Sequence, residues 1–268
     1  MTVTEITDPD DPRLAAYRDI RERDLVRRDG RFVAEGTTVL NVLARQQRFA
    51  VESALILKNR LAGLSDLLAD LPADVPVYSA PRAVIDAVAG FPIHRGVLAI
   101  GHRRRDCDGP PAHADLRSWT TVVALCGLAN HDNVGAVFRN AVALGADAVV
   151  MDAASCDPLY RKALRVSVGG VLVLPWHRFE STTAMADFLA GHGFALVGLS
   201  PSGTGRLESW TPPARTALVL GTEGAGLPPD ILARAQTLRI AMARDFDSLN
   251  VATSAALVLH HMRAFSAR

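Results

Sequence analysis

The stretch LVLGTEGAGLP, residues 218–228, gives the clearest indication of the fold. Its apolar start predicts a buried strand, and its glycines predict a tight turn directly after that strand. Sheets of α/β proteins hold nucleotide-like ligands at strand ends of this kind. The stretch therefore predicts an α/β fold with a ligand site immediately after this strand.

The glycine spacing excludes two common nucleotide motifs. Gly221, Gly224 and Gly226 fall in the reverse order of G-x-G-x-x-G, and Pro228 and Pro229 interrupt the chain almost at once. The Gly-Lys-Ser/Thr of a P-loop does not follow either. A tight turn that only needs positive φ angles remains an alternative for this stretch taken alone.

Two further stretches place polar side chains beside predicted helices. Residues 133–145, NVGAVFRNAVALG, follow a buried strand and set Arg139 among apolar residues, where its guanidinium either reaches solvent or binds an anion. Residues 240–251, IAMARDFDSLNV, bring Ser248 and Asn250 to the start of the last helix, where unpaired backbone N–H groups favour an anion. Each stretch is a weak signal alone, and the three together are a strong one.

The first part of the chain predicts a small α/β layer domain, residues 1–102. Its alternating pattern predicts helices at 13–28, 37–45, 62–71 and 82–88, and strands at 32–34, 51–57, 75–78 and 97–100. Residues 103–118 carry charge, Gly and Pro without hydrophobic periodicity, which predicts a linker.

Residues 119–268 predict a second α/β domain. We expect strands at 121–126, 148–151, 194–199, 216–220 and 237–240, and helices at 134–144, 159–167 and 249–265. Strands separated by helices imply a mostly parallel sheet that is covered on both faces.

Composition limits the function only loosely. The 29 lysines and arginines nearly equal the 28 aspartates and glutamates, so no global basic field predicts binding to nucleic acid. The positive charge is almost entirely arginine, which suits phosphates and bases, although high genomic G+C content produces the same bias. Composition alone therefore does not indicate RNA.

Cysteines, histidines and apolar runs exclude several other classes. Cys107, Cys126 and Cys156 include no C-x-x-C pair, which argues against disulfides and structural zinc, and the histidines show no metal or triad spacing. No metal site is therefore predicted. The apolar runs are too short for a membrane span and nothing near Met1 resembles a signal peptide, so we expect a cytoplasmic protein.

Taken in order, the three stretches resemble the signature motifs of the SpoU family in the SPOUT superfamily of RNA methyltransferases. The N-x-G-x-x-x-R-x-A-x-x-x-G motif is matched by Asn133, Gly135, Arg139, Ala141 and Gly145. The G-x-E-x-x-G-[LI] motif is matched by Gly221, Glu223, Gly226 and Leu227. The I-P-M-x-G-x-x-x-S-L-N-V motif is matched by Ile240, Met242, Ser248, Leu249, Asn250 and Val251. The resemblance spans residues 121–263.

Three further points qualify or extend the resemblance. Residues 162–174, KALRVSVGGVLVL, resemble the family's K-x-x-R-x-S-x-G stretch. Ala241 and Arg244 stand where the third motif usually has Pro and Gly, so the loop around the cofactor is expected to differ in shape or charge. The amino-terminal part, with Glu35-Gly36 and residues 94–99, HRGVLA, is similar to the ribosomal-protein-like RNA-binding domain that many members carry.

The resemblance implies a trefoil-knotted α/β domain, an exception to the rule that chains avoid knots. It implies that S-adenosylmethionine binds bent in the knot, and that the protein is a homodimer with active sites at or near the interface. The implied reaction is methylation of a ribose 2′-hydroxyl in RNA. Ribosomal RNA is preferred over transfer RNA because the amino-terminal domain is typical of members that act on ribosomal RNA.

The resemblance also implies roles for individual residues. The catalytic candidates are Arg139, Asn133, Ser248 and Asn250. An arginine is a poor base at neutral pH, so Arg139 either clamps a phosphate whose oxygen, or a water, takes the hydroxyl proton, or loses a proton itself; we favour the clamp. Capping of the helix or pairing with Asp132 is its structural alternative.

Cofactor and RNA contacts complete the expected site. The cofactor-binding candidates are Leu199, Gly221, Glu223, Gly224, Ile240, Met242, Ser248 and Leu249. The RNA-binding candidates are Arg18, Arg21, Arg28, Arg103, Arg104 and Arg105. Acidic residues interleave with the first three of these arginines, so a solvated, self-paired face is the alternative there.

Two other functions stay open. An RNA-binding protein that has lost turnover through its altered third motif would bind the cofactor without transferring methyl groups. A nucleotide-dependent enzyme that uses the glycine-rich turn would bind NAD or ATP.

Overall fold

The computed structural model describes residues 3–18, 30–104, 113–222, 224–243 and 248–266. The chain forms two compact units, unit 1 (Met1–Asp108 and Leu159–Val173) and unit 2 (Gly109–Pro158 and Leu174–Arg268). No helix in these described ranges is long and apolar enough to cross a membrane.

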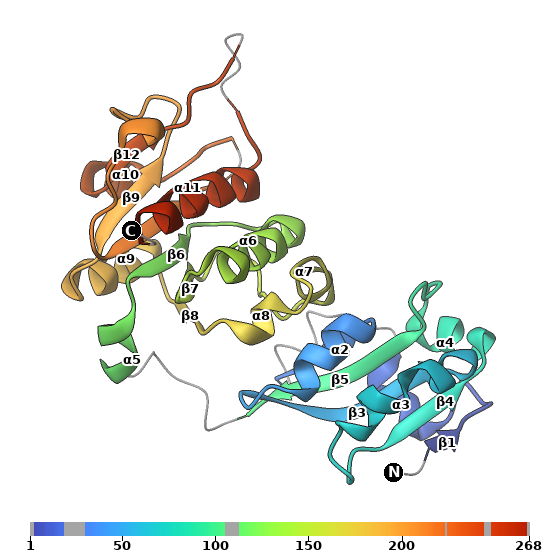
Figure 1. The fold of residues 1–268 in the computed structure, drawn as a ribbon. Helices are drawn as coiled ribbons and strands as arrows, with labels where there is room; N and C mark the ends of the chain where they lie inside the picture. Colours follow the sequence, from blue (N-terminus) through green and yellow to red (C-terminus); the bar gives the residue numbers. More distant parts are fainter. Residues whose placement is uncertain (1–2, 19–29, 105–112, 223, 244–247, 267–268) are drawn as a thin grey trace. The chain divides into compact units, whose positions relative to one another are not determined.

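Unit 1 is built on a mixed sheet with the strand order β1-β4-β3-β5-β2, and Figure 1 shows β3, β4 and β5. Its strands are β1 (Val3–Glu5), β2 (Arg31–Glu35), β3 (Phe49–Leu57), β4 (Val77–Ala80) and β5 (Val97–Arg103). Its helices are the 3-10 helices η1 (Pro12–Tyr17) and η2 (Lys58–Leu64) and the α-helices α2 (Thr37–Ala44), α3 (Ser65–Ala69), α4 (Arg82–Ala89), α7 (Arg161–Val166) and α8 (Gly170–Val173). Strand β5 runs antiparallel to β2 and β3.

Two helix predictions in unit 1 were wrong in detail. In the described part of the expected helix at 13–28, the chain forms the short η1 and is already extended at Arg18, whose guanidinium donates to the carbonyl oxygens of Pro9 and Asp11 at 3.0 Å each. Residues 19–29 lie outside the described ranges. The expected helix at 62–71 is divided into η2 and α3. Leu14 and Tyr17 are both buried and are three residues apart. Because a 3-10 helix has three residues per turn, one turn places both side chains on the same face.

The segment Leu159–Val173 packs in unit 1 although the residues on both sides of it belong to unit 2. Helix α7 contacts β2, and Nη1 of Arg161 lies 2.5 Å from Oε2 of Glu35, whose side chain is 4% exposed. Arg165 approaches the same oxygen at 3.6 Å, and Arg161 stacks 4.4 Å from the ring centroid of Phe91. A buried ion pair thus holds α7 against the sheet of unit 1.

Unit 2 is built on a parallel sheet with the strand order β10-β12-β9-β11-β6-β7-β8. Its strands are β6 (Thr121–Leu125), β7 (Ala148–Asp152), β8 (Trp176–Phe179), β9 (Ala195–Leu199), β10 (Gly205–Arg206), β11 (Thr216–Leu220) and β12 (Gln236–Arg239). Its helices are α5 (His113–Ser118), α6 (His131–Leu144), α9 (Thr182–Gly191), the 3-10 helix η4 (Leu207–Ser209), α10 (Pro229–Arg234) and α11 (Val251–Ser266). The predicted α/β class with a mostly parallel sheet is confirmed.

Helices cover both faces of this sheet. Alternate strand residues such as Val122 and Ala124 pack in one core with Met185 and Leu189 of α9. On the other side of the sheet α6 and α11 lie side by side (Figure 1), and α11 contacts β11. The alternation follows from the two-residue period of a strand.

Residues 113–118, which we expected to lack regular structure, form α5. Leu116 is buried in the core of unit 2, and the Arg215 guanidinium donates to its carbonyl oxygen at 2.5 Å. One buried leucine in a charged segment left no periodic signal in the sequence. Residues 105–112 of the expected linker lie outside the described ranges.

Candidate functional site

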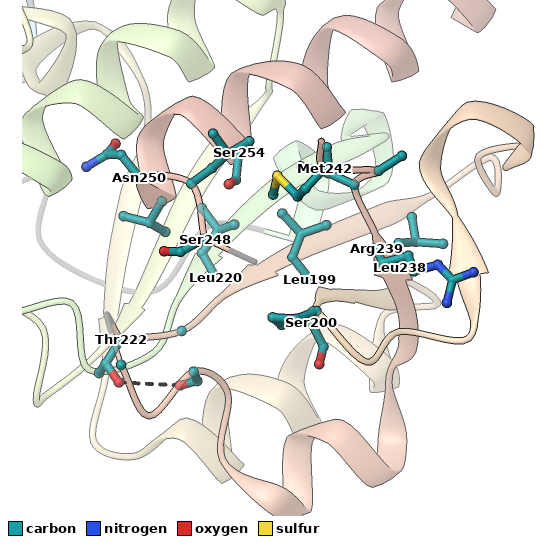
Figure 2. A pocket seen from close by; sticks show the side chains of 18 of the residues that line it. Leu199, Ser200, Leu220, Thr222, Leu238, Arg239, Met242, Ser248, Asn250 and Ser254 are labelled. Carbon is teal, nitrogen blue, oxygen red and sulfur yellow. Dashed lines mark hydrogen bonds between the residues drawn. The ribbon is translucent and has the colours of Figure 1, made fainter. Parts of the chain in front are cut away.

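A cavity of about 1110 Å³ opens where β9, β11 and β12 end. The strands end at Leu199, Leu220 and Arg239, and the residues that follow line the cavity together with the start of α11. Figure 2 shows Asn250 and Arg239 on opposite sides of it. Parallel α/β sheets bind ligands at this edge.

Most of the predicted site residues lie on the cavity wall. The structure places there Leu199, Gly221, Gly224, Ile240, Met242, Ser248, Leu249 and Asn250. Glu223 lies outside the described residues. The stretches around 221 and 240–250 therefore line the same cavity.

The glycine-rich turn after β11 folds back on itself. The backbones of Thr222 and Gly226 exchange two hydrogen bonds of 3.1 Å, and Gly224 and Gly226 have φ angles of +88° and +70°. A Cβ atom on Gly221 would lie 2.3 Å from the backbone of Gly226. Only glycine fits at position 221, because the close contact is with backbone and not with a flexible side chain.

The first and third stretches are joined by a hydrogen bond between two predicted catalytic residues. Nδ2 of Asn250 donates to Oδ1 of Asn133 at 2.8 Å. Oδ1 of Asn250 accepts from the N–H groups of Ala252 and Thr253 at 2.9 and 3.3 Å, which caps α11. Asn133 is 5% exposed, and Asn250 lines the cavity. Both polar ends of Asn250 are thus used to position the two stretches.

A second carboxamide strengthens the same junction. Nδ2 of Asn140 on α6 donates to the carbonyl oxygen of Ala252 on α11 at 2.8 Å. Helix α6 itself begins after Asn130, whose side chain accepts from the N–H of Asp132, and ends at Gly145 with φ +80°. These caps are the start and stop signals of a regular helix.

Arg139 is exposed on α6 and is not among the residues that line the cavity of this chain. Within the described residues it makes no hydrogen bond or ion pair, so the expected alternative of a pair with Asp132 is not seen. Its guanidinium is therefore available to an anion from outside the chain.

The loop that leads into α6 is supported by a buried carboxylate. Asp152, 3% exposed at the end of β7, accepts hydrogen bonds from the N–H of Gly127, from the N–H and hydroxyl of Ser155 and from the hydroxyl of Thr182. Gly127 has φ +66°, which favours glycine. The network fixes the chain between β6 and Asn133.

Charged residues lie on the side of the cavity opposite Asn250. Arg206 and Arg239 line it and are paired in register across β10 and β12. Nε of Arg206 lies 3.5 Å from Oε2 of Glu208, and the N–H of Ala241 donates to Oε1 of Glu208 at 3.3 Å. Hydrogen bonds from its own backbone N–H, from Ala241 and from Arg206 lower the pKa of Glu208, and burial opposes them. Glu208 is therefore ionised at neutral pH.

Several lining residues carried no motif signal, among them Ser200, Pro201, Arg206, Arg239 and Ser254. Ser200 and Pro201 follow the predicted strand at 194–199, so the rule that ligands bind at strand ends would have found them. Arg206 and Ser254 reach the cavity only through the tertiary fold.

The predicted RNA-binding arginines are only partly described. Arg18 is bound to backbone carbonyls near η1, Arg103 ends β5 and Arg104 follows it. Arg21, Arg28 and Arg105 lie outside the described residues. The ranges that the structure describes hold no group of His, Cys, Asp or Glu suited to a metal ion.

Comparisons with known proteins agree with this geometry. The model of the SpoU rRNA Methylase family matches residues 120–260. An uncharacterized tRNA/rRNA methyltransferase of Mycobacterium tuberculosis is 37% identical over 97% of this chain and 91% of its own length. The mitochondrial rRNA methyltransferase 1 of Homo sapiens is 27% identical over 82% of this chain and 69% of its own.

Solved structures share the fold over the whole chain. A crystal structure of an RNA 2′-O ribose methyltransferase superposes with a TM-score of 0.82 and 26% identity, and covers 99% of this chain and 100% of its own. An rRNA methyltransferase of Sinorhizobium meliloti bound to AdoMet has a TM-score of 0.79 at 23% identity and covers 98% of each chain. The family model matches more than half of the sequence, so the chain belongs to the SpoU rRNA methylase family.

Proposed function

We propose that the protein transfers a methyl group from S-adenosylmethionine to a ribose 2′-hydroxyl in ribosomal RNA. The observation that carries this proposal is the Asn250–Asn133 hydrogen bond, which joins the first and third motifs beside the cavity. The similar solved structure of an RNA 2′-O ribose methyltransferase and the rRNA methyltransferase among the relatives support the reaction and the substrate class.

The cavity fits S-adenosylmethionine in size and in lining. Its volume of about 1110 Å³ slightly exceeds the usual range of ligand pockets, about 300–1,000 Å³, so it has room for the cofactor. Leu199, Ile240, Met242 and Leu249 offer apolar surface for the adenine, and the backbone around Gly221 offers hydrogen-bonding groups. When bound, the cofactor supplies an electrophilic methyl group on a sulfonium.

The residues of the chain supply alignment and removal of a proton. Positioning contributes several kcal/mol in reactions of this kind, about 7–11 at most. Asn133 and Asn250 hold the cavity wall against α6, while Ser248 lines the cavity with a hydroxyl that both donates and accepts. Arg139 binds the phosphate beside the target ribose, and a phosphate oxygen or a water takes the hydroxyl proton.

A homodimer completes this proposal. Arg139 lies outside the cavity of its own chain, and the neighbouring Val142 on α6 and Leu257 on α11 are 37% and 42% exposed. Apolar side chains exposed on two adjacent helices suit a contact with a second copy. Sedimentation of the full chain tests the dimer, and a monomer at micromolar concentration contradicts it.

A cytoplasmic location stays a prediction from the sequence.

The test of the function is transfer of labelled methyl groups to total RNA from a strain that lacks the gene, followed by nucleoside analysis. We expect a 2′-O-methylnucleoside in ribosomal RNA, and we expect Arg139→Ala to reduce its formation at least tenfold without weakening cofactor binding. Label in transfer RNA instead would change the substrate. Cofactor binding without transfer to any RNA would favour the binding-protein alternative.

A further inference from the structure

Residues 240–242 form part of the cavity wall, yet they belong to no helix or strand. Among the described residues 240–243, 248 and 249, the hydrogen bond from the N–H of Ala241 to Oε1 of Glu208 is the single one outside the strand pairing. Glu208 itself does not line the cavity. The side chain of Glu208, which lies outside the cavity, therefore holds this part of the wall in position.

Glu208 lies in the 3-10 helix η4, and buried side chains and hydrogen bonds hold the residues beside it in place. Its neighbours Leu207 and Trp210 are 7% and 6% exposed. The indole of Trp210 donates to Oε1 of Gln236 on β12 at 3.0 Å, and His261 of α11 lies 2.7 Å from the Trp210 carbonyl oxygen. The 3-10 helix η4 is thus fixed to both the sheet and the last helix.

The two carboxylate oxygens of Glu208 contact two different residues. Oε1 accepts from Ala241, and Oε2 faces Nε of Arg206. Arg206 lines the cavity, so this one carboxylate contacts two parts of its wall. Ala241 stands where the resembled motif has proline, a residue without an N–H, so the bond to Glu208 exists because of this departure.

We propose that Glu208 is a positioning residue of the cofactor cavity, which holds residues 240–242 through the N–H of Ala241 in the shape that binds S-adenosylmethionine. The inference rests on the proposed cofactor but not on the proposed RNA substrate. It explains how the chain retains a defined wall without the proline of the third motif.

The test is a double-mutant cycle that measures S-adenosylmethionine binding by titration calorimetry on the full chain. Glu208→Ala is expected to raise the Kd about three- to tenfold, in keeping with the loss of one charge-assisted hydrogen bond at a half-exposed site. In the Ala241→Pro background, which has no N–H to lose, the same substitution is expected to change the Kd less than twofold. Equal effects in both backgrounds would overturn the proposal.

Hydrogen exchange gives a second readout that does not require Ala241→Pro to bind the cofactor. The Ala241 amide is expected to exchange faster in Glu208→Ala than in the wild-type chain, and an unchanged rate would contradict the proposal. Glu180→Ala is the matched control, because Glu180 is an exposed acid of unit 2 outside the cavity. A wild-type chain that binds the cofactor but methylates no RNA would refute the proposed function and leave this test intact.

Discussion

The structure brings several motif residues to one cavity, but the motifs did not show which atoms each residue would use. Ser248, Asn250 and Met242 line the cavity and also lie in a recognisable stretch of sequence. The use of both polar ends of Asn250, for a cap and for Asn133, depends on coordinates that no spacing reveals. The support from Glu208 was missed for the same reason, since it lies more than thirty residues before Ala241 in sequence and in no motif.

Substitutions at Asn250 separate its two tasks. Asn250→Asp keeps a good cap for α11 but replaces the amide donor that Asn133 accepts from, whereas Asn250→Ala removes both. We expect Asn250→Ala to lower the free energy of unfolding by about 1 kcal/mol. Asn250→Asp is expected to keep wild-type stability in urea and to lose at least tenfold in methyl transfer. Equal activity of Asn250→Asp and the wild type would show that the bond to Asn133 is dispensable.

The described cysteines are expected to be inert. Burial raises the pKa of Cys126 to about 12, with smaller effects of Asp152 and Asp230. Burial raises the pKa of Cys156 to about 12 as well. Since the thiolate is the reactive form and the pKa is raised, little thiolate exists at pH 8, and it increases only as the pH rises towards 12. Peptide mapping after iodoacetamide treatment at pH 8 should find both unmodified in the native chain and modified in urea.

At the scale of elements, regular hydrophobic patterns in the sequence predicted helices and strands correctly, whereas segments without such a pattern were missed. Strand β11 and helix α6 have apolar runs with clear glycine or cap signals, and both form where expected. Strand β8, with intermediate burial throughout and a sequence of WHRF, has no such run and was not predicted. The helix expected from residue 13 onward is interrupted at Arg18, where the chain leaves the short η1 in an extended conformation.

The turn after β11 gives a prediction for a whole element. Gly221→Ala places a methyl group within 2.3 Å of the Gly226 backbone, so the turn must open. We expect S-adenosylmethionine binding to weaken at least tenfold while the circular dichroism spectrum stays unchanged. Gly191→Ala at the end of α9 is the control, because nothing lies within 4 Å of its added Cβ. Wild-type affinity in Gly221→Ala would mean that the turn does not shape the site.

At the scale of the whole molecule, the composition predicted one division of the chain and the structure adds a discontinuous one. The boundary between Asp108 and Gly109 falls within the expected linker. The segment Leu159–Val173 packs in unit 1 although it lies inside the residues that match the family model. A helical pattern does not specify the unit against which a helix packs, so the sequence could not assign this segment. The trefoil knot stays a prediction.

Glu35 makes that assignment testable. Glu35→Gln leaves Arg161 and Arg165 without the carboxylate that holds α7 to β2. Removing one partner of a buried pair typically costs about 3–5 kcal/mol, and the partial exposure of Arg165 favours the lower end. Glu5→Gln is the control, because its pair with Lys58 on the same unit is half exposed and should contribute about 1 kcal/mol or less. We expect urea to unfold Glu35→Gln at a clearly lower concentration than Glu5→Gln. Coincident unfolding curves would mean that α7 is held in unit 1 by its apolar contacts and not by the ion pair.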